Sequence, residues 1–105
     1  MEITSVILNE GSGAMFRYKS SIPVSYERQG YIYFTSRLYR ELPERSQERI
    51  RTLCRQAGGE HWEALLEYVT AGASADSICT KHHLSYSSLL RAARRYFKLF
   101  PIPAL

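Results

Sequence analysis

The stretch ADSICTKHHLSYSSLLRAARR, residues 75–95, decides the fold that we predict for this chain. Ser74 precedes it and is a suitable N-cap for a helix over ADSICTKH, which has an acidic residue in its first turn where the helix dipole favours one. Ser85 is a second N-cap, for a longer helix over residues 86–99. Pro101 ends that helix, because the residue before a proline is pushed out of the helical region. The stretch therefore predicts two helices joined by a short turn.

Small and apolar residues stand where two closely packed helices need them. A helix-turn-helix packs its helices at a steep angle, so it needs a small residue in the first helix, an apolar turn residue and an apolar inner face on the second helix. Cys79 is the small residue, and Leu84 is the turn residue. Leu89 with Ala92 or Ala93 forms the inner face, and the alanines leave room for close approach. We therefore predict a helix-turn-helix.

The outward face of the second helix is basic. Spacings of three and four residues bring together hydroxyl side chains near its start and cations further along: Ser87, Ser88, Arg91, Arg94, Arg95 and Lys98. In a recognition helix the first residues contact base edges, and later Arg and Lys residues contact phosphates. The candidate base-reading residues are Tyr86, Ser87, Ser88 and Arg91, and the candidate phosphate-binding residues are Arg94, Arg95 and Lys98. The pattern predicts double-stranded DNA as a partner.

Two other interpretations of LLRAARRYFKLF, residues 89–100, stay open. A charged stripe opposite an apolar one is typical of any solvated surface helix. A basic amphipathic helix is also typical of membrane-surface peptides, but here alanines interrupt the apolar face and the preceding helices need it as a core partner. The single sign of the charge, on the second helix of the unit, favours DNA over both.

Two amphipathic helices are predicted ahead of this unit. In SQERIRTLCRQAGG, residues 46–59, apolar residues recur on one helical face, and the paired glycines end the helix. In EHWEALLEYVTAG, residues 60–72, the same spacing returns in Trp62, Leu65, Leu66 and Val69. Gly72 supplies the exit, and Glu63 and Glu67 are interpreted as a solvated helix face.

The first 45 residues are predicted to form either a small sheet or an arm. Their β-branched and aromatic segments are typical of short strands: EITSVIL (2–8), AMFRYK (14–19) and YIYFT (31–35). SRLYREL (36–42) is a candidate short helix. The expected fold class is mainly α: residues 1–45 form an N-terminal arm or β-containing extension, and residues 46–105 form a helical bundle with a C-terminal helix-turn-helix that binds DNA.

Composition sets the broad class of protein. The chain has 105 residues and a net charge of +4, which is the size of one ordinary domain with a modest preference for polyanions. The positive charge is concentrated, because residues 86–105 hold four Lys/Arg and no Asp/Glu. No apolar run approaches the roughly 20 residues of a membrane span, and MEITSVIL lacks the basic start of a secretory signal. We expect a cytoplasmic protein with free thiols at Cys54 and Cys79.

Metal and enzyme chemistry find little support in the sequence. His61, His82 and His83 together with the two cysteines show no spacing typical of a zinc site. His83 is interpreted instead as a turn residue with an unusual backbone angle, and His82 as packed against the core. No nucleophile elbow, phosphate loop or paired-carboxylate motif is visible. We therefore expect no catalytic activity, no cofactor and no metal.

A set of residues in this region is shared with a known family. It comprises an acidic–aromatic pair, a glycine exit, an apolar-Cys-x-Lys element, an apolar turn residue and two basic positions in the last helix: Glu67, Tyr68, Gly72, Ile78, Cys79, Lys81, Leu84, Arg95 and Lys98. On these residues the stretch ALLEYVTAGASADSICTKHHLSYSSLLRAARRYFKL resembles the helix-turn-helix region of the PapB-type regulators of fimbrial adhesin operons. The likeness covers residues 50–99 and is collinear through the motif.

The resemblance implies a mostly helical DNA-binding protein that regulates an adhesin or pilus operon. Members of that family bind AT-rich upstream DNA as oligomers along adjacent sites. We therefore expect a sequence-specific transcriptional regulator that binds an AT-rich operator as a homodimer or higher homo-oligomer. The alternative is a protein-interaction module, such as an antitoxin-like or anti-activator subunit, whose basic helix binds an acidic partner. The chain departs from the family at Ser87, Ser88 and Arg94, so the family's preferred DNA sequence does not carry over to it, and we expect Arg94 to raise its affinity for phosphate.

Overall fold

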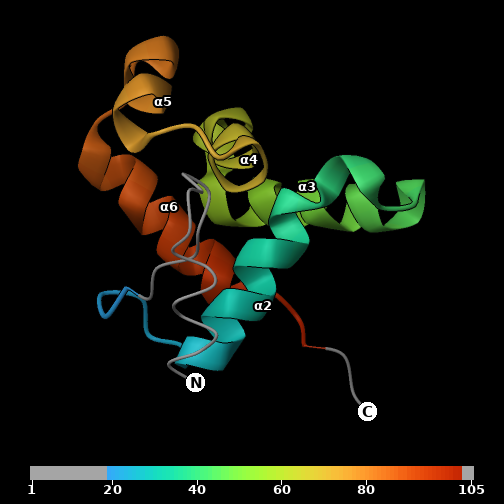
Figure 1. Ribbon diagram of the computed structural model, residues 1–105. Helices are drawn as coiled ribbons and strands as arrows, with labels where there is room; N and C mark the ends of the chain where they lie inside the picture. The colour runs from blue at the N-terminus through green and yellow to red at the C-terminus, as the bar shows by residue number, and fades with distance from the viewer. Residues whose placement is uncertain (1–18, 103–105) are drawn as a thin grey trace, which may run out of the picture.

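The computed structural model describes residues 19–102, and most of them are helical (Figure 1). The elements, in chain order, are α2 (Tyr26–Arg37), the 3-10 turn η1 (Tyr39–Glu41), α3 (Glu44–Gly58), the 3-10 turn η2 (Gly59–His61), α4 (Trp62–Ala71), α5 (Ala75–His82) and α6 (Tyr86–Leu99). No strand is present in residues 19–102. The mainly α fold class is therefore confirmed for this part of the chain.

The helices predicted after residue 46 form where the apolar spacing placed them. α3 begins slightly earlier than expected, after Pro43, and buries Ile50 and Cys54. Gly59 ends α3 with a φ of 56°, and Gly72 ends α4 with a φ of 74°, so both exits use a backbone conformation that glycine adopts without strain. Apolar periodicity and glycine positions were sufficient to predict both helices.

The strand predicted over YIYFT, residues 31–35, is wrong. These residues lie inside α2, which starts after Ser25, whose hydroxyl accepts a hydrogen bond from the Arg28 amide at 3.1 Å. β-branched and aromatic content reflects side-chain packing more than a backbone preference, and here the packing of a helix on the rest of the core prevails. Of the candidate short helix over residues 36–42, the first part ends α2 and the middle forms η1. EITSVIL and all but the last residue of AMFRYK lie outside the described residues.

One core joins four of the helices. It comprises Ile32 of α2, Ile50, Cys54 and Ala57 of α3, Leu65 and Val69 of α4, Ala92, Ala93 and Tyr96 of α6, and Phe100. At its centre Tyr96 is fully buried, and its hydroxyl shares a 2.6 Å hydrogen bond with Ser36. The residues after α6 are also attached, because Arg28 of α2 donates to the carbonyl oxygen of Phe100 at 3.0 Å. α2 thus packs into the same core as the helices that follow it.

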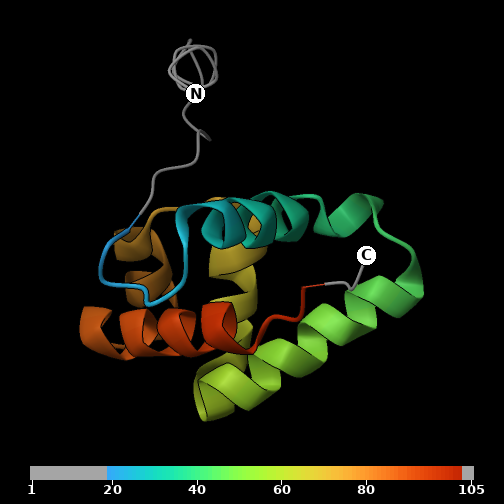
Figure 2. The same cartoon turned by 90° about the horizontal axis from the view of Figure 1, so that it is seen from below.

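The layers are clear when the molecule is seen from below (Figure 2). α4 passes between α2 on one side and α3 with α6 on the other. α5 lies at the end of the molecule away from α3, beside the start of α6 (Figures 1 and 2). Of the helices within residues 19–102, none has the length and apolar composition that crossing a membrane requires.

Candidate nucleic-acid interface

α5 and α6 are joined by a turn over residues 83–85. Both predicted N-caps are present: Ser74 accepts from the Ser77 amide at 3.2 Å, and Ser85 accepts from the Ser88 amide at 3.1 Å. His83 adopts the left-handed conformation, with a φ of 57°, as predicted for a turn histidine. Side-chain caps and one left-handed residue therefore define the turn.

A small apolar cluster sets the position of α6 against α5 and α4. Its buried members are Ala64, Ile78 and Leu89, one from each of the three helices. Cys79 and Leu84 are half-buried against this cluster, in the positions predicted for the small residue and the turn residue. The start of α6 is therefore fixed by packing on both neighbouring helices.

An ionic contact adds to this packing. Glu67 of α4 accepts from Lys81 Nζ at 3.0 Å and is hydrogen-bonded to His82 Nε2 at 2.8 Å. The hydrogen bonds from His82 and then Lys81 hold the pKa of the Glu67 carboxyl below its ordinary value. Of the two residues predicted to form a solvated helix face, Glu63 is exposed, whereas the Glu67 side chain is 30% exposed and contacts α5 through Lys81 and His82. The two partners lie about fifteen residues further along the chain, so helical periodicity gave no sign of the contact.

The predicted basic stripe lies on the outward side of α6. Ser87, Arg91, Arg94 and Lys98 follow one another at spacings of four, three and four residues, and all but the half-buried Arg94 are exposed. The opposite face is buried through Leu89, Ala92, Ala93 and Tyr96. At 1.5 Å of rise per residue the stripe is about 16 Å long. Its three cations, Arg91, Arg94 and Lys98, occupy about 10 Å of this length, and the exposed hydroxyl of Ser87 precedes them.

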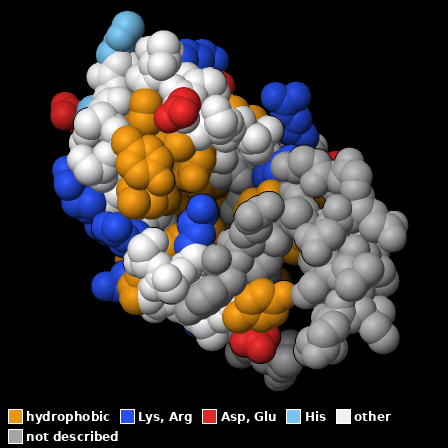
Figure 3. Space-filling model, turned by 60° about the vertical axis from the view of Figure 1, so that its left-hand side comes forward, with side chains coloured by type: hydrophobic (Ala, Val, Ile, Leu, Met, Phe, Trp, Pro, Cys, Tyr) orange, Lys and Arg blue, Asp and Glu red, His pale blue; other side chains and the backbone are white. Residues whose placement is uncertain are grey.

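The cations of this stripe have no carboxylate partners. Arg91, Arg94 and Lys98 form no ion pair with any other residue in the range 19–102, and α6 itself contains no acidic residue. On α3, by contrast, Arg51 and Arg55 pair with acidic residues of the same helix, at 2.6 to 3.4 Å. Figure 3 shows lysine and arginine side chains gathered along one edge of the molecule. Within residues 19–102, no carboxylate therefore pairs with these three cations.

Arg95 differs from the other predicted phosphate-binding residues. Its Nε donates a hydrogen bond to the carbonyl oxygen of Ala57 at 2.8 Å. Ala57 lies in the last turn of α3, so the Arg95 side chain extends toward that helix. The structure thus brings Arg91, Arg94 and Lys98 together on the stripe and gives Arg95 a partner inside the protein.

The predicted base-reading residues lie on different sides of the first turn of α6. Tyr86 is 56% exposed, and Ser87 is exposed on the stripe. Ser88 is half-buried, and its hydroxyl accepts from the capping hydroxyl of Ser85 at 2.9 Å. Ser87 and Tyr86 are thus presented to a ligand more openly than Ser88.

The thiols and histidines form no metal centre in residues 19–102, where no group of three or more His, Cys, Asp or Glu side chains converges. Both cysteines are free, and burial raises the pKa of the Cys54 thiol to about 12, which leaves it protonated and unreactive at neutral pH.

Comparison of the chain with protein-family models, with curated proteins and with solved structures finds no match. The geometry and charge of α6 are therefore the basis for a functional proposal.

Proposed function

We propose that the protein binds double-stranded DNA and regulates transcription, with α5, the turn and α6 acting as a helix-turn-helix. The observation that supports this most is the stripe of Arg91, Arg94 and Lys98 on the second helix of the unit, which forms no ion pair with any residue in the range 19–102. Packing of α6 against α4 and α5 holds this helix at the surface. A rigid helix with cations of one sign on its outward face suits the major groove of a duplex.

The roles of the stripe residues follow from their order along α6. Ser87 and Arg91 lie in its first half, where recognition helices contact base edges, and Tyr86 stands beside them. Arg94 and Lys98 lie further along, where long cationic side chains meet phosphates and supply affinity that depends on salt. Arg95 contributes mainly by positioning α6 against α3.

The family resemblance supports the proposed DNA target, and the spacing of DNA turns supports the proposed homo-oligomer. The resemblance to PapB-type regulators favours an AT-rich operator of an adhesin or fimbrial operon, and such a regulator acts in the cytoplasm. One α6 makes few contacts, whereas two copies separated by one DNA turn, about 34 Å, double them. We therefore propose a homodimer or higher homo-oligomer on DNA. Leu99 and Ile102, which are 47% and 42% exposed, belong to the apolar C-terminal segment that is a candidate for the contact.

Fluorescence anisotropy with a labelled AT-rich duplex tests DNA binding. For the full-length chain we expect log Kd to rise with log salt concentration, by about 0.9 per phosphate contacted. Arg94→Ala and Lys98→Ala each reduce that slope by about 0.9 if the residue contacts one phosphate. Arg45→Ala is the matched control, because Arg45 is an exposed arginine at the start of α3, away from the stripe.

Two outcomes contradict the proposal. Equal losses from Arg45→Ala and from the stripe variants would mean that only the net charge of the protein matters. Absence of DNA binding at low salt, together with tight binding of an acidic polypeptide such as polyglutamate, would favour the protein-interaction module instead. The proposed adhesin-operon target has its own test. A duplex from an adhesin-operon control region must displace the labelled duplex better than random DNA does at moderate salt.

A further inference from the structure

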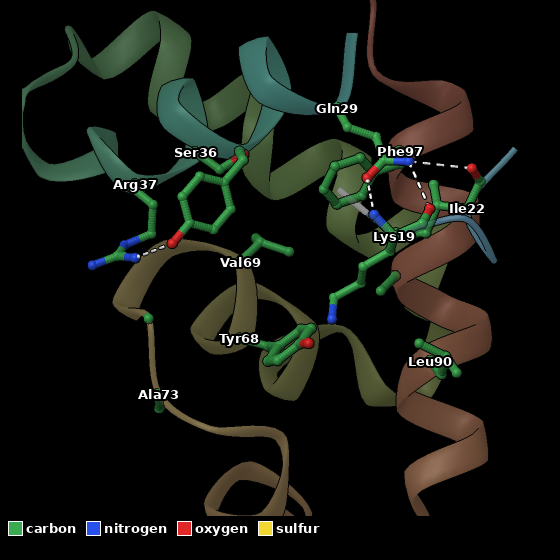
Figure 4. Close-up of a pocket in the computed structure, with 13 residues that line it drawn as sticks. Lys19, Ile22, Gln29, Ser36, Arg37, Tyr68, Val69, Ala73, Leu90 and Phe97 are labelled. Atoms are coloured by element: carbon green, nitrogen blue, oxygen red, sulfur yellow. Dashed lines mark hydrogen bonds between the residues drawn. The ribbon is translucent and has the colours of Figure 1, made fainter. Parts of the chain in front are cut away.

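A cavity of about 270 Å³ lies between α2, α4 and α6, next to the loop that precedes α2 (Figure 4). Most of its wall is apolar and comes from the loop before α2 and from two helices far apart in the chain: Ile22, Val69, Leu90, Ala93 and Phe97. Leu90 and Phe97 belong to α6 and lie on the flank beside the basic stripe, with Leu90 one turn before Arg94. The volume is near the lower end of small-molecule sites, which run from about 300 Å³.

The charged side chains that line this cavity are both positive: Lys19 and Arg37. Lys19 extends from the loop across the cavity toward Tyr68 (Figure 4). Arg37 lies at the side of the cavity near Ala73 (Figure 4). Its guanidinium donates a hydrogen bond to the Tyr33 hydroxyl at 2.9 Å. No aspartate or glutamate lines the cavity, and neither cation forms an ion pair with a described residue. Among residues 19–102, the charged side chains that line the site are therefore all positive.

Lys19 is held in place by a buried glutamine. Gln29 is 1% exposed, and its amide accepts from the Lys19 amide at 3.0 Å and donates to the Lys19 carbonyl oxygen at 2.8 Å. The same amide nitrogen also lies within hydrogen-bond distance of the carbonyl oxygens of Ile22 and Val24. A fully buried side chain thus fixes the backbone of the loop from which the exposed Lys19 side chain extends, which lowers the entropy cost of ordering this segment around a ligand.

Arg37 has a more restricted role than Lys19. Its guanidinium lies against Gly72, where a Cβ atom would come within 2.6 Å of Arg37 Cζ. Gly72 ends α4, so Arg37 faces the negative end of that helix dipole and is already partly compensated. Lys19 is therefore the cation with the greater capacity to bind an external anion.

Tyr68 supplies a hydrogen-bond donor opposite Lys19. Burial raises the pKa of the Tyr68 hydroxyl above its ordinary value, so this group stays protonated at neutral pH. The hydroxyl forms no hydrogen bond with another described residue. Every fully buried side-chain polar atom among the described residues has a hydrogen-bond partner, so the Tyr68 hydroxyl is not one of them and is accessible. Figure 4 shows the Lys19 side chain ending beside Tyr68, and an ammonium group near a hydroxyl donor, next to apolar side chains, matches a carboxylate on an apolar body.

We propose that this cavity binds a small organic anion, with its carboxylate between Lys19 and Tyr68 and its apolar body against Leu90 and Phe97. The site does not require that the protein bind DNA, and it is not part of the stripe on α6. The shape and charge favour a monocarboxylate about the size of an arylacetate. Larger anions such as nucleotides exceed the available volume.

Phenylacetate and its uncharged counterpart phenylacetamide test the proposal, by isothermal titration calorimetry and by amide NMR spectra of the full chain. We expect saturable binding of phenylacetate, with the largest shifts at residues lining the cavity, and binding of phenylacetamide that is about tenfold weaker. Lys19→Met keeps the apolar stem and should remove the preference for the carboxylate while the affinity for phenylacetamide stays the same. Arg45→Met removes one positive charge outside the cavity and should change neither affinity.

A variant that fills the cavity gives an independent measurement. Leu90→Trp should weaken the binding of both probes, and a melting curve like that of the native chain shows that it folds. The proposal is overturned if the two probes bind equally, or if the phenylacetate shifts map to Arg91, Arg94 and Lys98 instead of the cavity. It is also overturned if Arg45→Met lowers phenylacetate affinity as much as Lys19→Met, or if no saturable binding occurs.

Discussion

Arg95 of α6 donates a hydrogen bond from Nε to the carbonyl oxygen of Ala57, in the last turn of α3. Carbonyl groups at the end of a helix lack partners inside it, and a guanidinium there also faces the negative end of the helix dipole. The contact joins residues 38 positions apart and attaches the second half of α6 to α3. One of the arginines predicted to bind phosphate therefore has a partner within the protein.

Arg95→Ala should reduce the free energy of unfolding by about 1–2 kcal/mol, because a carbonyl at the end of α3 loses a charged donor. Arg94→Ala is the matched control on the same helix, and its effect should stay within about 0.5 kcal/mol. Urea denaturation measures both. DNA affinity should show the reverse order, with the larger loss for Arg94→Ala. Equal effects of both variants on stability would contradict the role assigned to Arg95.

Ser36 and Tyr96 form the second testable contact, a 2.6 Å hydrogen bond inside the core. Ser36→Ala leaves the Tyr96 hydroxyl buried without a partner, which should cost about 1–3 kcal/mol of stability. Tyr96→Phe should cost less, because a serine in a helix can bond to the carbonyl one turn before it. The double variant Ser36→Ala/Tyr96→Phe should lose less free energy of unfolding than the two single variants lose together, by about 0.5–1.5 kcal/mol. Additive effects in a double-mutant cycle would show that the bond adds no stability.

The same contact explains why α2 was not predicted. Its buried residues include the polar Gln29 and Ser36, while Tyr31 and Phe34 are 42% and 40% exposed. The amphipathic pattern of this helix is therefore partly inverted, and within residues 19–102 its buried polar side chains are hydrogen-bonded by the loop before it and by Tyr96. Periodicity in the sequence cannot show partners supplied by distant elements.

For α3 to α6 the sequence was a better guide, because apolar residues face the core at the helical period and serines or glycines stand at the ends. The stripe on α6 followed from the same period. The contacts of Arg95 with Ala57, and of Glu67 with His82, did not follow, since both depend on how separate helices cross.

Glu67 predicts a specific dependence of stability on pH. Hydrogen bonds from His82 and Lys81 hold its pKa below the ordinary 4.5, so the charged form is favoured in the folded state. Its contribution is present above that ordinary value and is lost as the pH falls through the lowered pKa of the folded state. Glu67→Gln should therefore destabilise the protein by about 1 kcal/mol at neutral pH and by much less at an acidic pH below the lowered pKa of Glu67.

Glu63→Gln is the control for this measurement, because Glu63 is exposed on the same helix. Its effect should be within about 0.5 kcal/mol at both pH values. Urea denaturation of the native chain and the two variants at each pH provides the comparison. A destabilisation by Glu67→Gln that is as large in acid as at neutral pH would show that shape, and not charge, is responsible.

Ser87 and Ser88 are neighbours in sequence, yet the structure predicts different effects for their alanine variants. Ser87 is exposed on the stripe with Arg91, whereas the Ser88 hydroxyl is bonded to the capping Ser85. If the start of α6 contacts base edges, Ser87→Ala and Arg91→Ala should change which duplex is preferred, with about 1–3 kcal/mol of discrimination lost for a good Arg–guanine pair. Arg94→Ala should instead weaken binding to all duplexes alike.

Selection of preferred sequences from a randomised duplex pool, followed by anisotropy at one fixed salt concentration, measures both quantities for each variant. Ser88→Ala should leave the preferred sequence unchanged, because its hydroxyl serves the cap and not the outward face. A changed preference for Ser88→Ala together with an unchanged one for Ser87→Ala would mean that α6 presents its other flank to the bases. An unchanged preference for Arg91→Ala would mean that the stripe contacts phosphates alone and that sequence is read elsewhere in the protein.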